Sequence, residues 1–297
     1  MPVLYTISFV IVAFHIYFYI YFQKPVVHIG SIAGPGFIFV YALLSLTSFF
    51  HELGHSSACH YFGAKHGDIG IGLYLYFVVF YADVTDVWKL KRIDRATVDF
   101  GGIYFQLICV LVLFTIYVLW RDVLMVEAIY AVDFAVIASM NPFFRFDGYW
   151  VVSDLSGVSN LRQRSQQIVK YIFGKLRGRI SVPPPSLPIE SKAKYFLGFY
   201  SLVSNLFFGF FIYSIFFSFP SLISSYSSIA GNSIVGIVHA IGVLDFWGVL
   251  HNLSVIFFPT VMVLMIGMMF YRGIKAIVKY FIKVTHHLPS TKFSFTK

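Results

Sequence analysis

The chain has 297 residues, of which 58% are hydrophobic and 20% aromatic, whereas only 12% are charged. This composition excludes a soluble globular domain of this length and predicts an all-α polytopic membrane protein in contact with the lipid bilayer. The formal net charge of +9 does not require a nucleic-acid partner, because the basic residues are distributed like those of membrane-protein loops.

Six apolar segments are long enough to cross a bilayer as helices, which rise about 1.5 Å per residue. The first segment lacks the basic stretch and the small-residue cleavage site of a signal peptide, so we expect it to be retained. A further apolar run, Ser233–Leu244, has only 12 residues, and we expect it to be re-entrant or interfacial. The six predicted spans are Val3–Phe22, Gly36–Phe62, Val98–Trp120, Leu124–Phe144, Ala193–Phe219 and Phe246–Tyr271.

The segment between the second and third spans has a different pattern. Ile69–Tyr81 is rich in β-branched and aromatic residues, and its odd positions from Ile69 to Val79 are all apolar. This alternation predicts a strand or a β-hairpin at the membrane surface. The alternative is a short extra helix, although 13 residues are too few to span a bilayer.

The middle of the chain holds a break and a polar stretch. Pro142 follows Asn141 at the end of the fourth span, and its missing backbone donor should kink or break that helix. Val151–Lys192 reads as an exposed basic loop with a short amphipathic helix near Leu161–Phe173. We therefore divide the chain into an N-terminal span with its outer loop, a core, a basic loop, and C-terminal spans with a basic tail. These parts are residues 1–35, 36–165, 166–192 and 193–297.

The positions of the lysines and arginines predict the orientation in the membrane. If the N-terminus is cytoplasmic, the cytoplasmic segments are 63–97, 143–194 and 272–297, and they contain 20 of the 22 Lys and Arg residues. Only Lys24 and Arg121 then lie outside. The positive-inside rule therefore predicts that both termini are cytoplasmic.

Two acidic residues, Glu127 and Asp133, lie in the outer half of the fourth span. Ionisable residues within a membrane usually pair or face the interior of the helix bundle. We expect these two to pair with Arg121 or to face that interior.

The second span contains the motif His51-Glu52-Leu-Gly-His55. On a helix, positions i and i+4 share a face, so both imidazoles can bind one metal ion. Glu52 lies about 100° around the helix and can approach a metal-bound water as a general base. Polar residues inside a membrane are costly and usually functional. The alternative is that packing partners satisfy these three side chains.

A catalytic zinc ion takes three protein ligands and leaves one position open. In the predicted topology the second and fourth spans both run inward, which places His51 roughly 22 Å past Gly36. Asp147 would lie about 35 Å past Leu124 in a regular helix, and less after the break at Pro142. Both residues fall in the cytoplasmic half, so Asp147 is a candidate third ligand. The alternative is an aspartate in a solvated turn.

The motif at residues 51–55, paired with Asn141-Pro-Phe-Phe-Arg-Phe-Asp147-Gly148, resembles the site-2 protease family of intramembrane zinc metalloproteases, which are peptidase M50-like. The tracts Asn141–Leu161 and Gly70–Trp88 are similar to a bacterial subgroup of peptide zinc metalloproteases. Genes of that subgroup often accompany genes for ribosomally made, modified peptides. The resemblance covers about residues 36–165.

The resemblance implies a Zn²⁺ cofactor held by His51, His55 and Asp147, with Glu52 as the catalytic base. It implies a membrane-associated β-hairpin at about residues 69–82 that could clamp an extended substrate. The sequence has no PDZ-sized insertion between the spans, so we do not expect such a domain to select the substrate. It also suggests that Asn141 positions the substrate or the oxyanion.

One tract departs from the family pattern. The family usually has Gly-Pro followed by an asparagine in the next span, where this chain has Gly101-Gly102 and then Gln106. Gln106 is therefore a candidate for the asparagine's role in positioning the substrate.

These features predict an intramembrane zinc metalloprotease of a bacterial cell membrane, with its active site towards the cytoplasm. The expected substrate is a peptide precursor or a membrane-anchored regulator. One alternative is a non-proteolytic protein of the same fold that acts in peptide binding, export or immunity. Another is a transporter, which would have inverted repeats and paired broken helices; the sequence has one break, at Pro142, and no repeat.

Overall fold

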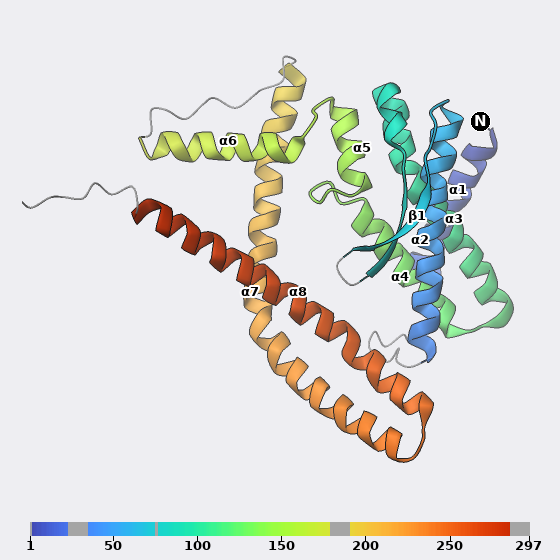
Figure 1. The fold of residues 1–297 in the computed structure, drawn as a ribbon. Helices are drawn as coiled ribbons and strands as arrows, with labels where there is room; N and C mark the ends of the chain where they lie inside the picture. The colour runs from blue at the N-terminus through green and yellow to red at the C-terminus, as the bar shows by residue number, and fades with distance from the viewer. Residues whose placement is uncertain (1, 23–34, 75–76, 179–190, 286–297) are drawn as a thin grey trace, which may run out of the picture. The chain divides into compact units, whose positions relative to one another are not determined.

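The structure is a computed structural model that describes residues 2–22, 35–74, 77–178 and 191–285. It is mostly helical with one two-stranded antiparallel hairpin, as the composition and the alternating tract predict (Figure 1). Most of the predicted basic tail, from residue 286 onward, lies outside the described residues. The chain forms two compact units, residues 1–212 and 213–297, which are considered separately below.

In the described part of the chain, five helical segments are long and apolar enough to cross a membrane, which indicates a membrane protein. They match five of the six predicted spans. They are Val3–Tyr21, Gly36–Tyr61, Arg92–Trp120, Ser191–Gly242 and Phe246–Lys275. The third begins six residues before the predicted Val98, because the tract from Arg92 continues the same helix with Asp94 in its first turn.

The fourth predicted span, Leu124–Phe144, is shorter than expected. Helix α4 covers Val123–Ser139, 17 residues, and does not continue to Phe144. Pro142 cannot donate to a helical ladder, and it disfavours the helical conformation of the residue before it. The predicted break therefore occurs, just ahead of the proline.

The first unit is built around a helix bundle. It contains α1 (Pro2–Ile16), the π-helical turn η1 (Tyr17–Tyr21), α2 (Pro35–Tyr61), α3 (Arg92–Trp120) and α4. The core between these helices is apolar and includes Phe18, Ile103, Val110, Val126 and Ile129, none of which is more than 1% exposed. Helix α3 packs against both α2 and α4 and so lies at the centre of the bundle.

Asp133 faces the interior of this bundle, which is one of the two alternatives predicted for it. Its Oδ2 accepts a hydrogen bond from Tyr19 at 2.5 Å, and its Oδ1 lies 3.3 Å from His15 Nε2. Its partners therefore come from the N-terminal helix, and Arg121 is not among them. Glu127 is also buried, and its Oε2 has no hydrogen-bond partner among the described residues.

The alternating tract forms a hairpin of β1 (Ile69–Tyr74) and β2 (Phe77–Ala82), in which Ile69 pairs with Ala82. The short-helix alternative is therefore wrong. Strand β2 packs against α2, where the rings of Phe49 and Phe80 are 5.5 Å apart. Ile71 and Leu73 on β1 are exposed.

Three short helices complete the first unit: η2 (Thr85–Lys89), α5 (Asp147–Ser156) and α6 (Leu161–Leu176). The predicted amphipathic helix is α6, which extends three residues beyond Phe173. The start of the predicted loop is instead the second half of α5, which ends where Gly157 adopts a φ of 68°. Tyr149, Leu161 and Leu197 form a second buried cluster, which joins α5, α6 and the start of α7.

Helix α7 (Ser191–Gly242) continues through Pro220 and does not end at the predicted Phe219. Most of the run Ser233–Leu244 belongs to this helix and is not a separate re-entrant element. In the second unit, α7 pairs with α8 (Phe246–Thr285) as a helical hairpin. The rings of Phe219 and Phe270 lie 5.0 Å apart across this pair.

Candidate metal centre

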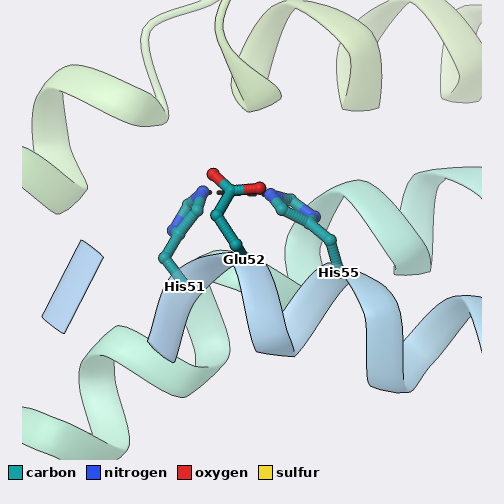
Figure 2. Close-up of side chains that lie close together, drawn as sticks. All are labelled: His51, Glu52 and His55. Carbon is teal, nitrogen blue, oxygen red and sulfur yellow. Dashed lines mark hydrogen bonds between the residues drawn. The ribbon is translucent and has the colours of Figure 1, made fainter. Parts of the chain in front are cut away.

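Two histidines on one face of α2 form the centre of the site. His51 Nε2 and His55 Nε2 lie 3.0 Å apart, as the i, i+4 spacing predicts. The carboxylate of Glu52 lies close to both, and the three side chains rise from the same side of the helix (Figure 2). His51, Glu52 and His55 therefore form a cluster that could hold a metal ion.

Asp147 meets these histidines from a different part of the chain. Its Oδ2 lies 2.9 Å from His51 Nε2, and its Oδ1 lies 3.5 Å from His55 Nε2. Because α4 ends at Ser139, the chain turns and starts α5 with Asp147 beside α2. Ser139 Oγ donates a hydrogen bond to Asp147 Oδ2 at 2.6 Å, which anchors the carboxylate to the end of α4.

The turn that delivers Asp147 depends on Gly148. A Cβ atom at this position would collide with the backbone of Met140, whose carbonyl lies against Gly148. The missing side chain thus lets the start of α5 pack closely against the end of α4.

The three donor atoms fit one metal ion. In a tetrahedral site with metal–ligand distances near 2.0–2.1 Å, neighbouring ligand atoms lie about 3.3 Å apart. The two Nε2 atoms lie 3.0 Å apart, and the Asp147 carboxylate approaches His51 at 2.9 Å through Oδ2 and His55 at 3.5 Å through Oδ1, all near that value. Two imidazoles with one carboxylate are also the ligand types of a catalytic zinc site that keeps its fourth position open.

The outer nitrogens of both histidines are held by α3. His51 Nδ1 lies 3.0 Å from Gln106 Oε1, and His55 Nδ1 lies 2.8 Å from the carbonyl oxygen of Val98. With Nδ1 donating to these oxygens, each Nε2 presents its lone pair to the metal position. Gln106 is buried behind His51, so the structure places it against a ligand, where it can orient the imidazole.

Glycines bring α3 this close to α2. A Cβ at Gly102 would lie 2.5 Å from His55 Nε2 and 2.6 Å from His51 Nε2. One residue earlier, a Cβ at Gly101 would lie 2.8 Å from the carbonyl oxygen of Gly54. The Gly101-Gly102 pair therefore forms the floor of the metal site, and no larger residue fits there without a shift of the helices.

The charge of Asp147 suits a metal ligand. Burial by itself would raise the pKa of its carboxyl group, but hydrogen bonding and attraction from His51, His55 and Ser139 outweigh burial and lower the pKa below its usual value. The carboxylate is therefore ionised at neutral pH, as metal binding requires.

Glu52 is connected to the hairpin. Its Oε2 accepts a hydrogen bond from the backbone N–H of Ala82 at 2.8 Å. Ala82 is the last residue of β2, so the end of the hairpin is tied to the candidate base. Sequence reasoning missed this contact, because a backbone donor leaves no side-chain signal.

Asn141 has a local partner in the structure. Its Oδ1 accepts a hydrogen bond from the N–H of Phe143 at 2.8 Å, which stabilises the turn after α4. Asn141 is half-buried and does not line the cleft beside the candidate metal site. The structure therefore gives Asn141 a role in the turn that delivers Asp147.

A cleft of about 360 Å³ opens beside Glu52, His55 and Asp147. Sequence reasoning did not single out the residues on its far side. They come from η2, α3 and α5, and include Trp88, Arg95, Asp99, Trp150 and Asp154. Only the fold brings these separate segments together.

No protein-family model matches the chain, and neither a curated protein nor a solved structure is significantly similar to it.

Proposed function

We propose that the chain is a zinc metalloendopeptidase of the site-2 protease type, which hydrolyses a peptide bond in or near the membrane. The observation that carries this proposal is the meeting of Asp147 with His51 and His55. Two motifs far apart in the sequence thereby supply one three-ligand set beside a carboxylate. The resemblance of these motifs to the site-2 protease family supports the same activity.

In this proposal His51, His55 and Asp147 hold Zn²⁺. The bound metal would supply Lewis-acid activation of water and of the scissile carbonyl group. Glu52 accepts the proton of the attacking water and delivers it to the leaving amine. The N–H of Ala82 holds Glu52 Oε2, which leaves Oε1 to accept the proton.

The hairpin offers a place for an extended substrate. A strand in a two-stranded sheet has one free edge, and an added peptide can hydrogen-bond to it. Ile71 and Leu73 of β1 are 67% and 79% exposed, which leaves apolar surface for the side chains of a membrane-derived peptide. We propose a peptide precursor or a membrane-anchored regulator as the substrate, cleaved on the cytoplasmic side of a bacterial cell membrane.

The non-proteolytic alternative needs a metal site with a purely structural role. Structural zinc sites use four protein ligands. Here two of the three proposed ligands, His55 and Asp147, and the separate carboxylate of Glu52 border a cleft that can admit water and substrate. This arrangement favours catalysis over peptide binding or export alone.

The first experiment needs no substrate. The protein is purified in detergent, and its metal content is measured together with that of the Glu52→Gln, His51→Ala and Asp147→Ala variants. We expect about one zinc ion per chain in the wild type and in Glu52→Gln, and loss of zinc from the other two variants. Zinc content that is indifferent to Asp147→Ala would refute the three-ligand site.

Activity is then tested with a mixture of peptides whose cleavage is followed by mass spectrometry. The wild type should cut peptides, whereas Glu52→Gln should keep its zinc and lose cleavage. Equal cleavage by both proteins would remove Glu52 from the mechanism and overturn the proposal.

A further inference from the structure

The cleft beside the metal site has one wall that the proposed mechanism does not use. This wall is formed by Trp88 of η2, by Arg95 and Asp99 of α3, and by Trp150 and Asp154 of α5. The cleft volume of about 360 Å³ lies at the lower end of the range for small-ligand pockets, about 300–1,000 Å³. It is large enough for one long side chain.

Among the described residues that line the cleft, the one arginine is paired with a carboxylate. Arg95 Nε donates to Asp154 Oδ2 at 3.0 Å, and Arg95 Nη2 donates to Asp154 Oδ1, so the pair is bidentate. Both side chains of this pair are mostly buried. The hydrogen bonds of the Arg95 guanidinium within the cleft therefore go to Asp154.

Asp99 lies one helical turn after Arg95 and borders the same cleft. Its carboxylate makes no hydrogen bond or ion pair with any residue in the described part of the chain. The lining also holds Glu52, Asp83, Asp147 and Asp154, so its carboxyl groups outnumber Arg95 and His55. A partly buried carboxylate without a partner favours a cation beside it.

The aromatic part of the wall suits the same ligand. Trp88 and Trp150 meet edge to face with ring centroids 6.3 Å apart. Trp88 already receives a cation, because the Arg95 guanidinium lies 5.1 Å from its ring centroid. Indole faces beside a carboxylate are a common environment for ammonium and guanidinium groups.

We propose that this cleft binds a lysine or arginine side chain of the substrate next to the cleaved bond, with Asp99 as the residue that pairs with it. The description of the ligand as a substrate rests on the proposed function. The inference agrees with the expected substrates, because membrane-spanning segments carry lysine and arginine at their cytoplasmic ends. Asp99 is a specificity-determining residue in this proposal, and it takes no part in bond cleavage.

The test measures binding, so it does not depend on cleavage. The probes are acetylated and amidated hexapeptides of alanine that carry one lysine at each position in turn. A matched set carries norleucine, which has a similar chain without the charge. Binding to the zinc-loaded, full-length Glu52→Gln protein in detergent is measured by titration calorimetry at low and high salt.

We expect the lysine probe to bind about tenfold more tightly than its norleucine partner at one position of the series. Asp99→Asn should abolish this preference, Asp99→Glu should keep part of it, and high salt should reduce it. Asp94→Asn is the matched control, because Asp94 lies on the same helix but does not line the cleft, and it should leave the preference unchanged.

Two results would overturn the inference: no lysine preference at any position, or a preference that persists in Asp99→Asn. Zinc content and thermal unfolding of each variant identify any loss of fold. If Asp99→Asn does not fold, the lysine preference of Asp99→Glu tests the proposal in its place. The outcomes separate the two proposals. If cleavage depends on Glu52 but no lysine preference is found, only the proposed binding site is refuted. If a lysine preference is found without cleavage, only the proposed protease activity is refuted.

Discussion

Gly102→Ala should disable the metal site while adding a single methyl group. The new Cβ would lie 2.5 Å from His55 Nε2, 2.6 Å from His51 Nε2 and 2.7 Å from His51 Cε1. Ordinary contacts begin near 3.4 Å, so α3 or both imidazoles must move by about 0.9 Å. Metal ligands tolerate deviations of only about 0.2 Å, and a shift of this size separates the three donors.

Two terms of opposite sign act on stability. Overpacking costs about 1–3 kcal/mol, whereas replacing glycine by alanine within a helix recovers about 1 kcal/mol. We therefore expect Gly102→Ala to fold with a free energy of unfolding lowered by at most about 2 kcal/mol. Its affinity for zinc should fall by at least the 10- to 100-fold that loss of a ligand's outer partner produces.

The assay is a zinc titration against a chromogenic chelator, with thermal unfolding measured in parallel. Gly198→Ala is the matched control, because a Cβ at that helical position meets no atom within 4 Å and should leave zinc affinity unchanged. Wild-type zinc affinity in a folded Gly102→Ala protein would show that α3 does not form the floor of the site, and would refute this reasoning.

Three further substitutions test other contacts of the site. Ala82→Pro removes the N–H that holds Glu52 and should lower kcat about tenfold with zinc content unchanged. Ala82→Gly keeps the donor and should preserve kcat. Equal kcat values for the two variants would contradict the role of this hydrogen bond. Gln106→Leu leaves His51 Nδ1 without its partner, and competition with a chelator should show zinc affinity lowered about 10- to 100-fold; unchanged affinity would show that this partner is dispensable. Asp154→Asn leaves Arg95 unpaired and should lower the free energy of unfolding by about 3 kcal/mol, as measured by denaturant titration. The double variant Arg95→Met/Asp154→Leu should recover part of that loss, and no recovery would argue against a buried-charge penalty.

Patterns that repeat along one element were predicted well from the sequence. The i, i+4 spacing of His51 and His55 is confirmed by their 3.0 Å separation. The alternation in Ile69–Tyr81 is confirmed by the hairpin, with β2 ending one residue later at Ala82. Both patterns are local, so neighbouring residues are enough to reveal them.

Helix ends were predicted less well. Pro142 predicts a break in the fourth span, but helix α4 already ends at Ser139. The chain then turns and starts α5 at Asp147. Pro220 does not end α7, which shows that a proline in a long apolar helix can be accommodated. Tertiary contacts determine where these helices end, and such contacts cannot be predicted from a single sequence.

The part of the cleft lining beyond Glu52, His55 and Asp147 could not be predicted from the sequence. Arg95 of α3 and Asp154 of α5 form their ion pair with the whole of α4 between them in the sequence, and no sequence pattern links them. The same holds for the carbonyl of Val98 behind His55, since every residue has a carbonyl group. Contacts of this kind become visible only when the bundle is assembled.

In the proposed protease, the hydrogen bond between Ala82 and Glu52 would connect substrate binding with catalysis. Ala82 ends the β2 strand that pairs with β1, and the same residue donates its N–H to the candidate base. A peptide added to the hairpin edge would continue a hydrogen-bond ladder whose register is set by β1 and β2. Because the ladder ends on Glu52, its register also fixes how far each peptide bond of the substrate lies from the metal ligands. Position along the strand, and not side-chain recognition alone, would then select the bond that is cut.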